Sequence, residues 1–115
     1  MDHRPDADRA RAADRADAYA EAVLDVVARI PAGRAITYGA IAEWLGSGGP
    51  RQVGTVMARY GGGVPWHRVV NASGRLVPGH EVEALRRHRA EGTPLRGPNL
   101  DRVDLAVAFW SPDEQ

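Results

Sequence analysis

Hydrophobic residues follow a helical period in three stretches of the chain, and the first begins at Tyr19. The spacing is that of one buried helix face, i, i+4, i+7 and i+11. The positions are Tyr19, Val23, Val26 and Ile30. Pro31 and Gly33 then interrupt the pattern. The spacing predicts a helix that belongs to the core.

The second periodic stretch, ITYGAIAEWLG, predicts a helix of about two turns. Thr37 is a good N-cap, because its hydroxyl can accept a hydrogen bond from a free amide of the first turn. Ile36 and Ile41 occupy the two positions of a hydrophobic staple. Gly46 suits the residue after the last turn, where a left-handed backbone ends many helices.

A third helix is expected to begin at Pro50, which fits the first helical position, and to end at Gly61. Its apolar positions recur at i, i+3, i+4 and i+7. They are Val53, Val56, Met57 and Tyr60. Only the turn Gly46–Gly49 separates this helix from the second one, so the pair predicts a helix-turn-helix.

Downstream, residues 64–79 combine a β-branched run, the turn residues Asn71–Gly74 and a second short apolar run. This pattern predicts a small hairpin or wing. A helix is expected from about Glu81 to Glu91, and a Pro/Gly loop over 93–102. Residues 103–109 alternate as a strand would, and a helical turn ending at Trp110 is the alternative.

These elements give one domain that is mainly α-helical with a small β hairpin, of winged helix-turn-helix type. We place it at residues 18–112. Residues 1–17 alternate Asp, Arg and Ala without a large apolar side chain, so we expect a frayed or flexible tail there. Residues 113–115 are expected to be a second short tail. Gly61–Gly63 is interpreted as a flexible link.

The outer face of the third helix carries a polar set with a gap at Gly54, where another backbone could approach. The set is Arg51, Gln52, Thr55 and Arg59. Such a face fits recognition of a nucleic acid, and an ordinary solvent-exposed face is the alternative.

The amino-acid composition excludes several classes of function. The chain has 115 residues and no cysteine, which excludes disulfides, thiolate metal sites and a cysteine nucleophile. All fifteen basic residues are Arg, balanced by fifteen acids. An all-Arg set suits phosphate and base contacts, but a coding bias that also enriches Ala and Gly is the simpler explanation. The longest apolar run, Leu105–Trp110, is too short for a membrane span, and we expect a soluble cytoplasmic protein, nucleoid-associated if the source is bacterial.

Metal and cofactor sites are not expected. The histidines, His3, His67, His80 and His88, lack the i, i+4 spacing that places two imidazoles on one helix face. The glycine-rich segments lack the Lys of a phosphate-binding loop.

Four segments in order carry a resemblance to a known family: ITYGAIA, PRQVGTVM, PWHRVVN and RAEG. Together they resemble the DNA-binding domain of O6-alkylguanine-DNA alkyltransferases, whose reactive cysteine lies in a Pro-Cys-His-Arg motif. Here Trp66 occupies the cysteine's place. With Trp in place of the cysteine, the chain resembles the alkyltransferase-like proteins. This resemblance implies that the protein binds alkylated guanine in DNA but does not repair it.

The resemblance implies a role for each matching residue. Tyr38 would crowd the target phosphate and help to rotate the nucleotide outward, and Arg51 would enter the duplex and fill the gap. The third helix would then lie in the minor groove, where Gly54 permits close approach. Trp66, Pro65 and Tyr38 would line the alkylguanine pocket, with the Trp66 carbonyl and the Val69 amide bonding the guanine edge.

His67 and Glu91 match the pair that activates the thiol in the transferases, and without a thiol they are expected to pack and hydrogen bond only. The resemblance thus implies a monomeric, non-enzymatic damage sensor whose partners are O6-alkylguanine DNA and nucleotide excision repair proteins. Two alternatives are a sequence-specific transcription factor that uses the major groove, and a hydrolase with His67 and Glu91 as general base.

Overall fold

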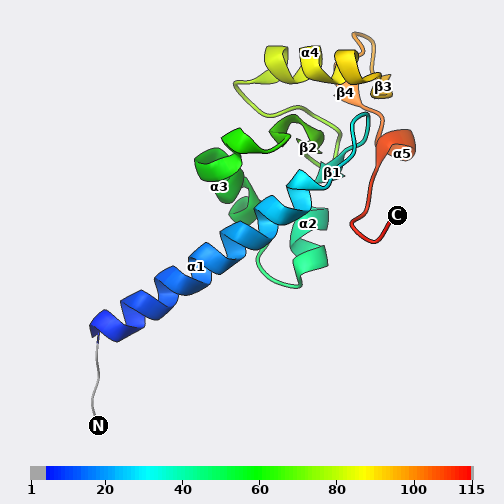
Figure 1. Cartoon of the computed structure of the whole chain (residues 1–115). Helices are drawn as coiled ribbons and strands as arrows, with labels where there is room; N and C mark the ends of the chain where they lie inside the picture. The colour runs from blue at the N-terminus through cyan, green and yellow to red at the C-terminus, as the bar shows by residue number, and fades with distance from the viewer. Residues whose placement is uncertain (1–4, 115) are drawn as a thin grey trace.

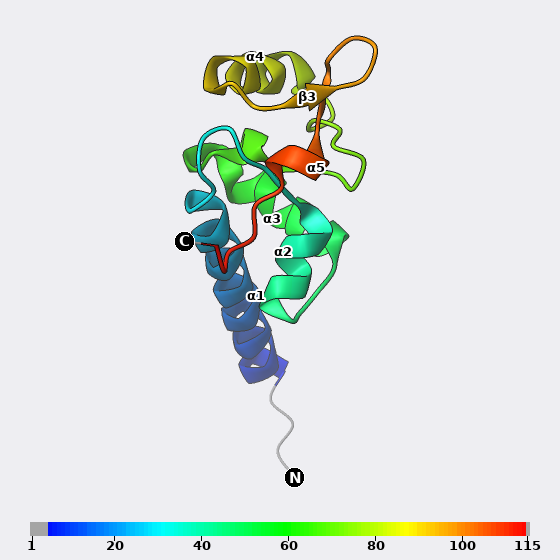
Figure 2. The same ribbon diagram turned by 90° about the vertical axis from the view of Figure 1, so that its right-hand side faces the viewer.

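The computed structural model describes residues 5–114 and is mostly helical with a small amount of sheet, as the sequence predicts. Two layers are visible in Figure 1 and, from the side, in Figure 2. Helices α1 (Pro5–Ala28), α2 (Tyr38–Leu45) and α3 (Pro50–Tyr60) form one layer. Helix α4 (Glu81–Glu91) lies across the other end with the strands β3 (Leu95–Arg96) and β4 (Arg102–Val103). Among the described residues, no helix is long and apolar enough to cross a membrane.

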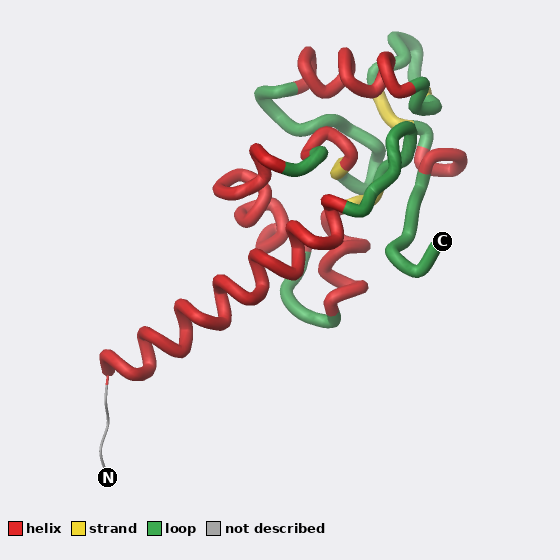
Figure 3. Tube along the Cα trace, viewed as in Figure 1, coloured by secondary structure: helices red, strands yellow, loops and turns green. Residues whose placement is uncertain are grey.

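Helix α1 spans Pro5–Ala28 and is longer than expected. Its C-terminal part packs in the core through Val23, Val26 and Val27. Residues 5–17, within the segment expected to be a frayed or flexible tail, continue the helix as an exposed arm (Figure 3). Ala and Arg are strong helix formers, and the ion pair between Asp8 and Arg11, one turn apart, adds support. Residues 1–4 lie outside the described residues.

The helix-turn-helix forms as predicted. Helix α2 spans Tyr38–Leu45, and the Thr37 hydroxyl caps it by accepting a hydrogen bond from the Ala40 amide at 3.0 Å. Gly46 follows in the left-handed conformation, with φ 69°. Helix α3 spans Pro50–Tyr60. Local capping chemistry therefore places both helix ends.

A long-range contact fixes the turn between α2 and α3. The Tyr19 hydroxyl of α1 donates to the Ser47 carbonyl at 3.0 Å. Gly48 has φ +71°, and a Cβ there would come within 2.6 Å of the Tyr19 hydroxyl. The turn and the first residues of α3 are thus held against α1.

Two expectations around the end of α3 need correction. Tyr60, expected on the apolar face, is the last residue of α3 and is 51% exposed. Gly61–Gly63, interpreted as a flexible link, forms a short 3-10 helix, η1. Gly61 is buried, and its amide donates to the Met57 carbonyl, which continues the helical hydrogen bonding.

The hairpin expected over 64–79 is wrong. After the 3-10 turn η2 (Trp66–Arg68), strand β2 (Val69–Val70) pairs in parallel with β1 (Ile36–Thr37). The Asn71–Gly74 turn does form, and the Asn71 side chain accepts from two backbone amides. The antiparallel hairpin is instead β3 (Leu95–Arg96) with β4 (Arg102–Val103), where we expected a loop.

Two apolar clusters lie on the two sides of the β1–β2 pair. Ile36 and Val69 join the cluster of α1, α2 and α3, and Val70 joins a smaller cluster with Ala84 of α4, which spans Glu81–Glu91 as predicted. This sheet therefore connects the two layers.

The C-terminal segment closes the fold through α5, Leu105–Ala108, the helical alternative for this region. The Trp110 amide donates to the Ala35 carbonyl at 2.8 Å, and the Trp110 ring is buried. Glu114, expected in a tail, binds the Arg34 guanidinium at 3.0 Å. Residue 115 of that tail lies outside the described residues.

Candidate nucleic-acid interface

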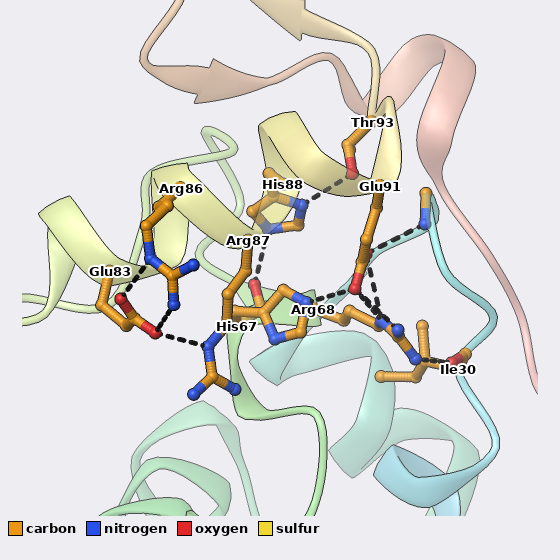
Figure 4. Close-up of polar contacts among 10 residues, drawn as sticks. Ile30, His67, Arg68, Glu83, Arg86, Arg87, His88, Glu91 and Thr93 are labelled. Atoms are coloured by element: carbon orange, nitrogen blue, oxygen red, sulfur yellow. Dashed lines mark hydrogen bonds and ion pairs between the residues drawn. The ribbon is translucent and has the colours of Figure 1, made fainter.

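A buried polar network centred on Glu91 links α4 to the loop that holds Trp66 (Figure 4). Glu91 Oε1 accepts hydrogen bonds from His67 Nε2 and from Arg68 Nη2, each at 2.7 Å. Glu91 Oε2 accepts from the Gly33 amide at 3.0 Å, and Arg68 also donates to the Ile30 carbonyl. One carboxylate thus joins three segments that are distant in sequence.

The network fixes the protonation of His67. Burial alone would raise the pKa of Glu91, but the hydrogen bonds from Arg68, Gly33 and His67 hold that pKa at about 2. The carboxylate is therefore ionised and accepts, so His67 Nε2 carries the proton. Burial lowers the pKa of His67 and keeps the ring neutral. Its other nitrogen, Nδ1, is a buried acceptor without a donor among the described residues.

His88, which is fully buried, supports the same loop from α4. Its Nε2 donates to the His67 carbonyl at 2.7 Å, and its Nδ1 accepts from the Thr93 hydroxyl at 2.8 Å. Burial lowers the pKa of His88, so it stays neutral with both nitrogens satisfied. Sequence reasoning considered His88 only as a metal ligand and missed this role, as it missed Arg68 and Gly33.

A pocket of about 570 Å³ opens between the two layers. Helix α3 and the following 3-10 turn form one wall, and Trp66 lies on another. The segment before α4 forms the far wall with Val77, Pro78 and His80. The remaining lining residues are Tyr38, Gly54, Met57, Ala58, Gly61 and Gly62. Tyr38, Gly54 and Trp66, which the sequence singled out, are thus brought together around one cavity.

Trp66 is held by aromatic and cationic neighbours. The Arg87 guanidinium of α4 lies over the ring, 5.0 Å from its centroid. Arg87 also donates to Glu83 at 3.0 Å. His67 and His80 approach the ring edge-on, with centroid distances of 6.0 and 5.8 Å. These contacts define the position of the ring at the pocket.

Two other expected pocket residues lie elsewhere. Pro65 precedes η2 and is not among the lining residues. Val69 is fully buried in β2, and its amide donates to the Trp66 carbonyl within the 3-10 turn. The two backbone groups assigned to the guanine edge are therefore bonded to each other in this structure.

The predicted polar face of α3 is exposed to solvent at Arg51, Gln52, Thr55 and Arg59. Gln52 accepts from the Gly49 amide at 2.9 Å and so caps the helix. Thr55 donates to the Arg51 carbonyl at 3.1 Å. A Cβ built on Gly54 meets nothing within 4 Å, so this position is an open gap beside the pocket.

A protein-family model described as "6-O-methylguanine DNA methyltransferase, DNA binding domain" matches residues 18–92. The match covers α2, α3, the Trp66 loop and α4. This chain is an alkyltransferase-like member of that family.

Individual members of the family are similar over most of the chain. The DNA base-flipping protein of Escherichia coli (strain K12) is 36% identical over 103 residues, which cover 85% of this chain and 78% of that protein. Alkyltransferase-like protein 1 of Schizosaccharomyces pombe is 33% identical over 107 residues, which cover 85% of this chain and 99% of that protein.

A solved structure of S. pombe Atl1 in complex with damaged DNA containing O6-carboxymethylguanine superposes with a TM-score of 0.72. The sequences are 32% identical, and the match covers 84% of this chain and 97% of that one. A second structure, of the same S. pombe protein with DNA, gives a TM-score of 0.71.

Proposed function

We propose that this protein is a non-enzymatic damage sensor that binds O6-alkylguanine in double-stranded DNA by flipping the nucleotide into the Trp66 pocket. The observation that carries the proposal is Trp66 itself, which lines a pocket beside an intact His67–Glu91 pair. An indole cannot replace a thiolate as nucleophile, since its nitrogen lone pair belongs to the ring. The site can therefore hold an alkylated base without accepting its alkyl group.

Helix α3 is proposed as the DNA-contacting element, in the minor groove. The absence of a side chain at Gly54 lets the groove walls approach the helix. Arg51 is exposed in the first turn of α3 and is the residue that would enter the duplex and replace the flipped base. Gln52, Thr55 and Arg59 lie on the same helix for backbone contacts.

Tyr38 would push the target phosphate, since it lines the pocket at the start of α2. The flipped guanine would rest against Trp66, and the Trp66 carbonyl retains one lone pair for the guanine amino group. The Val69 amide could bond the base only if the 3-10 turn opened, because it donates to Trp66 here.

The sensor would act as a monomer in the cytoplasm and would mark the lesion for nucleotide excision repair proteins. Binding without chemistry requires such a recipient, because the lesion stays in the DNA. His67 and Glu91 then serve the position of the loop, and the buried Glu91 network supports that role.

A binding titration tests the proposal. Matched duplexes with guanine or one O6-methylguanine should differ in affinity, since a weakened base pair costs less to open. Equal affinity for both, with tighter binding to one unrelated sequence, would instead support a transcription factor.

Alkyl transfer is tested with DNA that carries a labelled methyl at guanine O6. We expect all label to remain on the DNA. Label on the protein, or methanol released into solution, would contradict the non-enzymatic function.

Two variants test the assigned roles. Trp66→Ala should reduce the preference for damaged DNA by roughly tenfold, because a stacking contact is lost, while affinity for plain DNA changes little.

Arg51→Ala should diminish the fluorescence rise of 2-aminopurine placed next to the lesion, even at saturating protein. An unchanged rise, with equal loss of affinity for both duplexes, would make Arg51 only a phosphate contact.

A further inference from the structure

The far wall of the Trp66 pocket contains a polar side chain that the proposed function leaves unused. His80 is exposed at the pocket and comes within 5.8 Å of the Trp66 ring, centroid to centroid. Its backbone is fixed at the start of α4. The His80 amide donates to the Val77 carbonyl, and the His80 carbonyl accepts from the Ala84 amide, each at 3.0 Å. The imidazole is therefore presented to the cavity from a defined position.

The lining of the pocket makes His80 chemically distinct. Most lining residues are apolar or glycine, and three carry a nitrogen or oxygen in the side chain: Tyr38, Trp66 and His80. Among the described lining residues none carries a carboxylate. Tyr38 is assigned to the target phosphate and Trp66 to the base. His80 is the donor left for the substituent on O6.

The charges behind the wall favour an anion at this place. The Arg87 guanidinium lies over the Trp66 ring at 5.0 Å. Glu83 binds both Arg87 and Arg86, so these three side chains together carry one net positive charge. Glu81 follows His80 in sequence but lines a second pocket, which shares only Pro78 with this one. A carboxylate on the adduct would thus meet a donor and a positive field.

We propose that His80 is a specificity residue that donates a hydrogen bond to O6 substituents ending in a carboxylate or another oxygen acceptor. The protein then binds O6-carboxymethylguanine more tightly than an apolar adduct of the same size. This inference rests on the proposed binding of O6-alkylguanine in the pocket. A charge-assisted hydrogen bond at an accessible site should give a preference on the order of tenfold.

The test compares three duplexes that differ only at one guanine: unmodified, O6-carboxymethyl and O6-isobutyl. The two adducts have the same number of heavy atoms, so their affinity ratio reports the carboxylate. His80→Phe keeps an aromatic ring beside Trp66 but removes both ring nitrogens, and it should abolish the ratio. His80→Gln retains a donor and should restore most of the ratio.

Glu81→Gln is the matched control. It removes one negative charge next to His80 but outside this pocket, so it should raise the affinity ratio slightly or leave it unchanged, whereas His80→Phe should lower it. A ratio that moves as much in Glu81→Gln as in His80→Phe would assign the preference to the general field and overturn the role of His80.

The outcomes separate this inference from the proposed function. If neither adduct binds more tightly than guanine, the proposed function fails. If both adducts bind more tightly than guanine but His80→Phe leaves their ratio unchanged, the proposed function stands and the role of His80 is wrong.

Discussion

Two carboxylates on α4, Glu83 and Glu91, are bound by arginine in different surroundings. Each has its pKa lowered to about 2, for Glu83 chiefly by hydrogen bonds from Arg86 and Arg87. The Glu83 side chain is 39% exposed and all its partners lie on the same helix, whereas Glu91 is 15% exposed and joins α4 to two distant segments. Equal pKa values therefore hide unequal structural roles, because water and salt screen the exposed pair.

The largest expected difference between the two carboxylates is the difference in stability between the variants Glu91→Gln and Glu83→Gln. Removing the Glu91 charge leaves Arg68 and the Gly33 amide without an ionised partner and should lower the free energy of unfolding by about 3 kcal/mol. Glu83→Gln should leave the midpoint of unfolding nearly unchanged. Urea titrations monitored by tryptophan fluorescence measure the free energy of unfolding of both variants. Similar losses in the two variants would show that the buried network has no special weight.

The dependence of the unfolding free energy on acid pH should show the same difference between Glu91 and Glu83. The folded pKa of Glu91, about 2, lies below the ordinary value of 4.5, so its stabilisation is complete above about pH 5 and is lost as pH falls from 4.5 towards 2. Burial also lowers the pKa values of His67 and His88 below 6.5. Their stabilisation is likewise present above pH 6.5 and lost below it.

We therefore expect the unfolding free energy of the wild-type protein to fall in two ranges on acidification. Glu91→Gln should lose a larger part of the fall between pH 4.5 and 2 than Glu83→Gln does, because the exposed Glu83 pair is screened, and it should keep the fall below 6.5. Urea unfolding at closely spaced pH values checks this. A Glu91→Gln variant with the full acid slope would assign that slope to other carboxylates.

The smallest expected effect separates the two arginines that share Glu83. Arg87 lies over the Trp66 ring, whereas Arg86 binds Glu83 and has no cation–π contact with an aromatic ring of the described residues. Arg87→Met should reduce the preference for O6-methylguanine over guanine about two- to fivefold, since a partly exposed cation–π contact is weak. Arg86→Met should leave the preference unchanged. Equal effects would reduce Arg87 to a general electrostatic contribution.

The parts of the fold that were predictable are those that local chemistry decides. The Thr37 cap, the left-handed Gly46 and the first-turn Pro50 each act within one helix end, so the helix-turn-helix followed from short segments. The N-terminal extent of α1 could not be predicted from the apolar pattern, because its first turns bury nothing and depend on intrinsic helix propensity.

The pairing of the strands was not predictable, because the sequence of a two-residue strand does not indicate which other strand it pairs with. The Asn71 turn was correctly identified, but Val69 pairs with Ile36 across the whole helix-turn-helix. In the candidate site, Trp66, His67 and Glu91 were found through the family resemblance. His80 and Arg87 were missed, since their positions at the pocket depend on how α4 folds back over Trp66.

The parallel pairing of β1 with β2 has a consequence for the order of events during synthesis. Tyr38 directly follows β1 and Trp66 lies just before β2, so the two pocket residues meet only after a long loop closes. Ala35, next to β1, also pairs with the segment that ends in Trp110, near the C-terminus. A growing chain can form α1, α2 and α3 early, whereas the pocket needs β2 and the segment up to His80, which are translated later. Chains released before that segment is made would retain helix α3 without the complete Trp66 pocket.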